Sequence, residues 1–203
     1  MRLRLPLLLL SGVLSAAGDP PTIPDSSVTL RVEPFLVSRW SLAPGTAVTV
    51  DFELNADGTV KDALIRSPQT MDESLERMAM AFQFWRFVPN TPSPGRYVYY
   101  APGRREVTSP RLVDRNEPDY DAEARDKRIQ GKAVCYVIIG TDGKVLRAQS
   151  LRWVPEAGSG ADGDGGLLKK AVESLKSWRF DPATRNGRAV AVAAMVEINF
   201  RLN

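Results

Sequence analysis

The stretch Trp178-Arg179-Phe180-Asp181-Pro182, together with Asp142-Gly143-Lys144-Val145 before it, decides the fold of this chain. Both occur once before, in the same order, as Asp57-Gly58-Thr59-Val60 and Trp85-Arg86-Phe87-Val88-Pro89. The gaps between the landmarks nearly match, apart from extra residues in the second copy at 156–166. Landmarks that keep their order and spacing indicate an internal repeat.

Each copy begins with a predicted pair of strands. Residues 48–54 alternate apolar and polar side chains, which is typical of a strand with one buried face. Asp57-Gly58 predicts a tight type I′ hairpin, in which both central residues have positive φ, and a return strand at 59–66. The second copy has the equivalent strands at 133–139 and 144–151. Because residues 133–139 are apolar on both faces, we expect another part of the protein to cover the second face.

A helix follows each hairpin. Apolar residues recur at helical spacing in both copies, at Leu75, Met78, Ala79, Phe82 and Trp85 and at Leu168, Ala171, Val172, Leu175 and Trp178. Such a stripe predicts an amphipathic helix packed on a sheet, with the tryptophans as core anchors. Pro89 and Pro182 are expected to end the helices soon after these tryptophans.

The copies differ in their last strands. Alternating apolar residues predict a long final strand at 190–202 in the second copy, whereas the first copy has only 97–100. An additional strand at 28–33 is expected to compensate for this short one. Residues 102–117 are interpreted as a linker, and residues 121–128 as a short helix.

Residues 1–18 are predicted to be a cleavable signal peptide. Arg2 and Arg4 precede an apolar run at 5–14, and Ser15-Ala16-Ala17 supplies the small residues that a signal peptidase reads. The apolar run is shorter than the roughly 20 residues that span a bilayer. We therefore expect export to the periplasm, and the alternative is an uncleaved inner-membrane anchor.

The amino-acid composition excludes several classes of function. The net charge of +3 falls to +1 without Arg2 and Arg4, which gives no reason to expect nucleic-acid binding. The chain contains no histidine, which excludes Ser–His and Cys–His dyads and histidine metal sites. Cys135, the single cysteine, is interpreted as a buried, inert thiol. We expect no enzyme activity, no cofactor, no metal and no small-molecule substrate.

With these landmarks in place, the chain resembles the C-terminal domain of the TonB family. The second copy carries the resemblance at Tyr120, Gly131, Asp142–Val145, Leu168, Ala171, Trp178–Ala183, Gly187 and Val190, and the first copy from Gly45 to about Gly95. The resemblance implies a periplasmic module that binds a short peptide of an outer-membrane receptor, the TonB box. It also implies force transmission from an inner-membrane motor.

The chain departs from that family pattern at two places. Tyr120-Asp121 stands where the family has Tyr-Pro, and only Pro20, Pro21 and Pro24 stand where full transducers have a long proline-rich spacer. We therefore interpret the protein as a relative that keeps the fold without energy transduction. True transduction is an alternative that requires the N-terminus to stay uncleaved.

The predicted fold class is α+β: two tandem TonB C-terminal-like modules, each a small antiparallel sheet with one packed amphipathic helix. The expected bounds are 1–18 for the signal peptide, 28–101 for the first, divergent module, 102–117 for the linker and 118–203 for the second module.

The predicted function, which follows from the resemblance, is binding of envelope proteins of the TonB-dependent receptor type by strand addition to the free edge of the final strand, with a link to TonB-dependent transport. The residues expected to contact the partner are Tyr120, Arg188, Val190, Ala191, Val192, Ala193, Ala194, Met195 and Val196. The alternative is a self-associating structural envelope protein, which predicts a homodimer through edge strands or a continuous two-module sheet with no free edge.

Overall fold

The computed structural model describes residues 19–34, 42–66, 73–103, 106–120, 122–159 and 163–202, so the predicted signal peptide lies outside it. The elements are a 3₁₀ turn (Asp25–Ser27), β1 (Val28–Leu30), β2 (Val32–Glu33), β3 (Ala47–Leu54), β4 (Val60–Arg66), α1 (Glu73–Phe82), β5 (Arg86–Phe87), β6 (Gly95–Tyr100), β7 (Arg111–Asp114), α2 (Ala122–Asp126), β8 (Gly131–Ile139), β9 (Val145–Pro155), α3 (Leu167–Leu175), β10 (Arg179–Asp181), β11 (Ala183–Arg185) and β12 (Arg188–Phe200). Within these described ranges, no helix has both the length and the apolar character needed to cross a bilayer.

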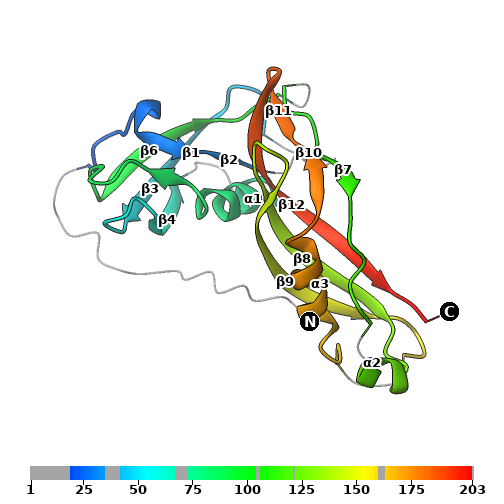
Figure 1. Ribbon diagram of the computed structural model, residues 1–203. Coiled ribbons are helices and arrows are strands. Elements are labelled where there is room, and N and C mark those ends of the chain that lie inside the picture. The colour runs from blue at the N-terminus through cyan, green and yellow to red at the C-terminus, as the bar shows by residue number, and fades with distance from the viewer. Residues whose placement is uncertain are drawn as a thin grey trace.

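The first unit is a three-stranded antiparallel sheet with α1 packed on one face (Figure 1). β3 is the central strand, between β4 and β6. Its core is aromatic: Phe82 lies 4.8 Å from the ring of Trp85 and 5.7 Å from the ring of Phe52. The ring of Tyr97 meets Trp85 edge-on at 5.0 Å. The alternating side chains of β3 supply one wall of this core, as the sequence predicts.

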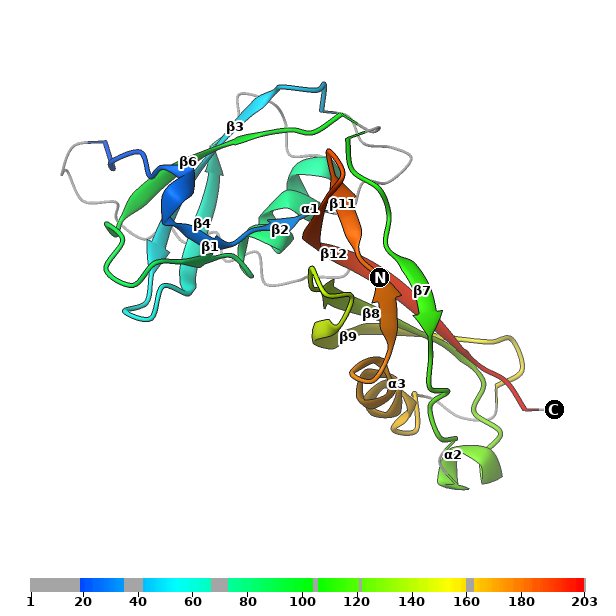
Figure 2. The ribbon, with the colours of Figure 1, turned by 45° about the horizontal axis from the view of Figure 1, so that its top comes forward.

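The second unit repeats this order of elements. β8 is central, between β9 and β12, and α3 packs on one face of the sheet. In both units a hairpin is followed by a helix and then by a strand on the other side of the first hairpin strand. The strands of the second unit are longer, and β12 extends from beside the first unit to the C-terminus (Figures 1 and 2).

The tip of each hairpin touches the Trp-Arg-Phe strand of its own unit. The Phe87 N–H donates to Gly58 O at 2.9 Å, and the Phe180 N–H donates to Gly143 O at the same distance. The predicted type I′ turn is wrong at Asp57, because only the glycine of that pair has a positive φ. The loop is a longer one that ends in a left-handed glycine.

A type I′ geometry occurs elsewhere, at Asn186-Gly187, where φ is 50° and 76°. These two residues join β11 to β12, with Arg185 paired to Arg188. Asn-Gly is a strong hairpin signal that the repeat-based interpretation of the sequence did not use. The final strand is therefore the second half of a hairpin.

The helices are shorter than predicted. α1 ends at Phe82 and α3 at Leu175, so each tryptophan lies beyond its helix. The Trp85 N–H still donates to Phe82 O at 3.0 Å, which tightens the chain into a turn before the next strand. Both tryptophans are buried core anchors, as predicted.

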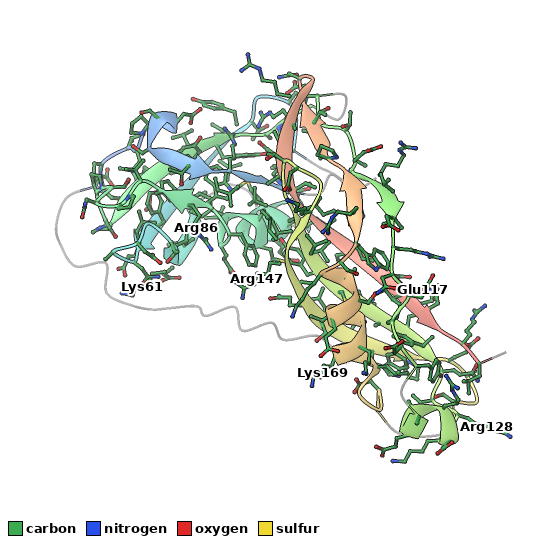
Figure 3. The ribbon with its side chains drawn as sticks, viewed as in Figure 1. Lys61, Arg86, Glu117, Arg128, Arg147 and Lys169 are labelled. Carbon is green, nitrogen blue, oxygen red and sulfur yellow. The ribbon has the colours of Figure 1, made fainter. Side chains whose placement is uncertain are left out.

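The core of the first unit extends onto the sheet of the second. Tyr136 and Ile138 of β8 belong to the hydrophobic cluster of the first unit, and Phe84 lies 5.8 Å from the Tyr136 ring. Arg147 of β9 lies 5.1 Å above the Phe84 ring, at the junction seen in Figure 3. The expectation that something covers the second face of residues 133–139 is confirmed, and the cover is the first unit.

Two segments depart from their predicted roles. The expected single strand at 28–33 is two strands, because β1 pairs with β5 of the first unit and β2 pairs with β12 of the second. The predicted linker 102–117 contains β7, which pairs with β10. Both departures connect the units more tightly than a linker would.

Candidate partner-binding edge

Eight of the nine predicted contact residues lie on β12, and Tyr120 lies before α2. Arg188 and Met195 are exposed, Val190 and Val196 are half-buried, and Ala191, Val192, Ala193 and Ala194 are buried. The neighbours of β12 differ along its length. The two parts of the strand, Arg188–Val192 and Ala193–Phe200, therefore differ in what could pair with them.

The upper part of β12, Arg188–Val192, pairs with β11 and β2 of the same chain. β11 pairs with Arg188–Val190, and β2 pairs in parallel with Ala191 and Val192. Val192 also pairs with Ile139 of β8, so both backbone edges are occupied at this residue. The prediction of a free edge is therefore wrong at Ala191 and Val192, where β2 occupies the place expected for a partner.

β2 is held in this place by side chains from both units. The Trp85 Nε1–H donates to Val32 O at 2.9 Å, in a buried contact. The Glu33 carboxylate is 1% exposed and accepts from Tyr99 Oη at 2.6 Å and from Arg185 Nη1 at 2.8 Å. Tyr99 belongs to the first unit and Arg185 to the second, so Glu33 ties the units together. Figure 2 shows β2 reaching from the first unit to the upper end of β12.

The electrostatics of this contact favour β2 staying paired with β12. Burial and the nearby Glu33 carboxylate raise the pKa of Tyr99 well above its ordinary value, so the hydroxyl stays a donor. Burial alone would lower the pKa of Arg185, but Glu33 raises it above the ordinary value. Breaking a buried charge pair costs about 3–5 kcal/mol. A partner that replaced β2 would gain only two cross-strand pairs, worth roughly 0.2–1 kcal/mol each.

The lower part of β12, Ala193–Phe200, is different. β8 pairs with all eight of these residues without a register shift, and no other strand of the described ranges pairs with them. Their second backbone edge therefore has no strand beside it within the described part of the chain. Ala193 and Ala194 are small, which lets another backbone approach closely, and Met195 is 45% exposed. We call Ala193–Phe200 the open edge.

The opposite edge of the sheet, formed by β9, is protected against strand addition. Register shifts place the extra residues Leu146 and Leu151 on β9, and such bulges interrupt a regular edge. β9 also carries the exposed charges Arg147 and Arg152 and ends in Pro155. Charges, bulges and proline are the features by which proteins block edge pairing. The one charged side chain before Phe200 on the open edge is Glu197, which pairs with Lys132 at 3.3 Å.

Tyr120 is not part of the open edge but packs beside its lower end. Its ring meets Phe200 edge-on at 5.8 Å, and its hydroxyl donates to Ile129 O. The preceding segment is fixed beside the end of α3, because Ser174 Oγ–H of α3 donates to Asn116 O, and the Trp178 Nε1–H donates to the same oxygen at 2.9 Å. Glu117 of this segment is labelled in Figure 3. The structure gives Tyr120 a packing role beside Phe200, at the end of the open edge.

Sequence reasoning did not assign a role in the edge to Val32, Glu33 or Arg185. The alternation of residues 28–33 indicated a strand but not its partner. A glutamate at the end of a strand ordinarily indicates a solvated side chain, and here it is one of the most deeply buried groups. In the described ranges no three His, Cys, Asp or Glu side chains are grouped to hold a metal ion.

Comparison with known proteins finds a family match over the second unit. Residues 116–202 match the profile of the family described as Gram-negative bacterial TonB protein C-terminal, and residues 28–101 lie outside that match. Among solved structures, the chain is similar to the TonB C-terminal domain of Pseudomonas aeruginosa determined by solution NMR, at 22% identity over 48% of this chain and 88% of that one, with a TM-score of 0.35. No curated protein matches the chain.

Proposed function

We propose that this protein is a non-catalytic binding protein of the periplasm that takes up an extended segment of an envelope protein by strand addition. The observation that carries the proposal is the open edge: eight consecutive residues, in register with β8, with no strand on their other side in the described ranges. Backbone N–H and C=O groups of such an edge supply the affinity, and the flanking side chains supply the specificity. The TonB-type match over residues 116–202 supports an envelope partner.

The first unit is proposed to be a divergent copy of the same module. Three equivalences support this. Both units have a strand on each side of the first hairpin strand, both hairpin glycines accept from the phenylalanine of Trp-Arg-Phe, and both arginines of that motif donate to the tryptophan carbonyl at 2.9 Å. The proposed binding activity belongs to the second unit, because the open edge and the family match both lie there.

Export is proposed on the sequence of residues 1–18. Their charged start, short apolar run and small residues before Asp19 fit a cleavable signal peptide. N-terminal sequencing of the protein from a periplasmic fraction tests this. A start near Asp19 is expected, and an intact Met1 in the membrane fraction would support the anchored alternative.

The binding proposal is tested by titrating the mature protein with TonB-box-like receptor peptides, followed by amide exchange. Micromolar binding that slows exchange at alternate amides of Ala193–Phe200 is expected. The same peptide N-methylated at alternate residues should not bind, because it lacks the donors that a strand contributes. Deleting the end of β12 is not a suitable control, since Ile198 and Phe200 are core residues.

A matched pair of variants locates the peptide on one edge. Met195→Lys adds a charge to the open edge, and Leu146→Lys adds the same charge to β9, where Leu146 is 53% exposed. With a lysine-containing peptide, Met195→Lys should weaken binding by about two- to fivefold, since cross-strand pairs are worth roughly 0.2–1 kcal/mol. Leu146→Lys should change nothing. Equal effects at both positions would contradict addition at β12.

A second candidate function is self-association as a structural envelope protein. It is favoured by the pairing of β2 with β12, because this edge already takes up a strand from outside the second unit. The open edge would then pair with the same edge of a second copy. Sedimentation velocity over a range of concentrations distinguishes the two, because a dimer that excludes the peptide would support self-association.

A further inference from the structure

We infer that β2 is a built-in end stop that limits a partner strand to the open edge, Ala193–Phe200. The inference rests on the proposed function, since it names how the length and position of the bound segment are set. A partner beside β12 would run along these eight residues and meet β2 at Val192. Eight residues of strand are about 26 Å long. A longer segment would have to leave the sheet at that point.

The end stop has a short, rigid structure. β2 consists of only Val32 and Glu33, and it is followed by Pro34, which is buried. β2 runs parallel to β12, so the next residue of β2 would stand beside Ala193. Proline has no N–H to donate to a strand ladder, and it is confined to strand ends and edges. Pro34 therefore ends β2 and leaves the edge open from Ala193 onward.

The stop is anchored too firmly for a short peptide to remove it. The Val32 carbonyl accepts from Trp85 Nε1, and the Glu33 carboxylate accepts from Tyr99 and Arg185. Val32 is 0% exposed and Glu33 is 1% exposed. Displacing β2 would leave these groups buried without partners, whereas an invading peptide would gain only the two positions that β2 now fills. The first unit thus serves as a fixed boundary for the binding edge of the second.

A nested series of TonB-box-like peptides tests the end stop on the mature protein. Affinity should rise at least about fivefold between peptides of about five and about eight paired residues, and by less than about twofold between about eight and about twelve. The amides of Val32, Glu33, Ala191 and Val192 should keep their exchange rates when the peptide binds. Faster exchange at these amides, or affinity that keeps rising with length, would overturn the inference.

A variant keeps the test decisive if no peptide binds. Pro34→Val removes the block, and the sequence that follows, Phe35-Leu36-Val37, has a high strand propensity. In the free variant β2 should lengthen along the open edge, and outward amides at Ala193–Met195 should exchange at least about tenfold more slowly. Pro155→Val, at the end of β9, is the matched control and should leave these amides unchanged.

The two results separate the two ideas. Absence of peptide binding with slowed exchange in Pro34→Val would refute the binding of these peptides and retain Pro34 as the residue that ends β2 at Val192. Unchanged exchange in Pro34→Val would show that Pro34 is not what ends β2, and affinity that keeps rising with peptide length would refute the end stop itself.

Discussion

Gly143 lies at the tip of the β8–β9 hairpin, and replacing it with alanine should be among the most destabilising single changes in the second unit. Its φ is +76°, and an added Cβ would stand 1.8 Å from Phe180 O. A left-handed conformation costs an L-residue roughly 1–2 kcal/mol. The overlap adds to this cost, because the tip must move away from β10 and lose the hydrogen bond from the Phe180 N–H to Gly143 O.

The chain provides a control with the same backbone conformation. Gly187 also has a φ of +76°, but an added Cβ there meets nothing within 4 Å. Gly187→Ala should therefore cost only about 1–2 kcal/mol for the left-handed backbone. Gly143→Ala should cost at least about 2 kcal/mol more, from one lost hydrogen bond and the displaced contact. The difference between the two variants isolates the tip contact.

The first unit allows the same comparison independently. At Gly58 an added Cβ would stand 2.0 Å from Phe87 O, whereas Gly45, with a φ of +79°, has free space. All four variants should be compared by urea unfolding with a common m-value. If Gly143→Ala and Gly58→Ala cost no more than Gly187→Ala and Gly45→Ala, the tip contacts do not stabilise the fold and the reasoning is refuted.

Three further results are expected. Burial raises the pKa of Cys135 to about 11, so at pH 8 a thiol reagent should label the native protein at least about a hundredfold more slowly than the protein in denaturant. Burial alone would raise the pKa of Asp51, but hydrogen bonds from Arg96 and Arg66 lower it overall. Asp51 therefore stabilises the folded state at pH values above its unfolded pKa of about 3.9. Asp51→Asn should lower the free energy of unfolding by about 1–3 kcal/mol at neutral pH. Urea unfolding should show that this difference shrinks as the pH falls below about 4. Glu33→Gln should cost about 3–5 kcal/mol of unfolding free energy. The control Glu53→Gln, whose carboxylate is 49% exposed, should cost at most about 1 kcal/mol. Similar values for the two variants would show that the buried contact is weak.

Several features of the fold could be predicted from residues close in sequence. Alternation predicted β3 and β12 because a half-buried strand requires it, whereas β8 was predicted from an apolar run on both faces before a turn signal. Helical spacing predicted α1 and α3. The helix ends were less predictable. Trp85 continues the apolar stripe of α1 but is buried after a turn, since a large ring can fill the same core from either backbone conformation.

The sequence by itself determined the repeated order of hairpin, helix and final strand, and the choice of β12 as the candidate binding strand. Those features follow from local periodicity, which each segment carries alone. Only the tertiary structure decided which part of β12 is open. Residues 28–33 carry a strand pattern that fits either unit, and β2 pairs with β12 because Trp85, Tyr99 and Arg185 surround Val32 and Glu33 in the folded protein. Pairing between distant strands depends on contacts that no local pattern encodes.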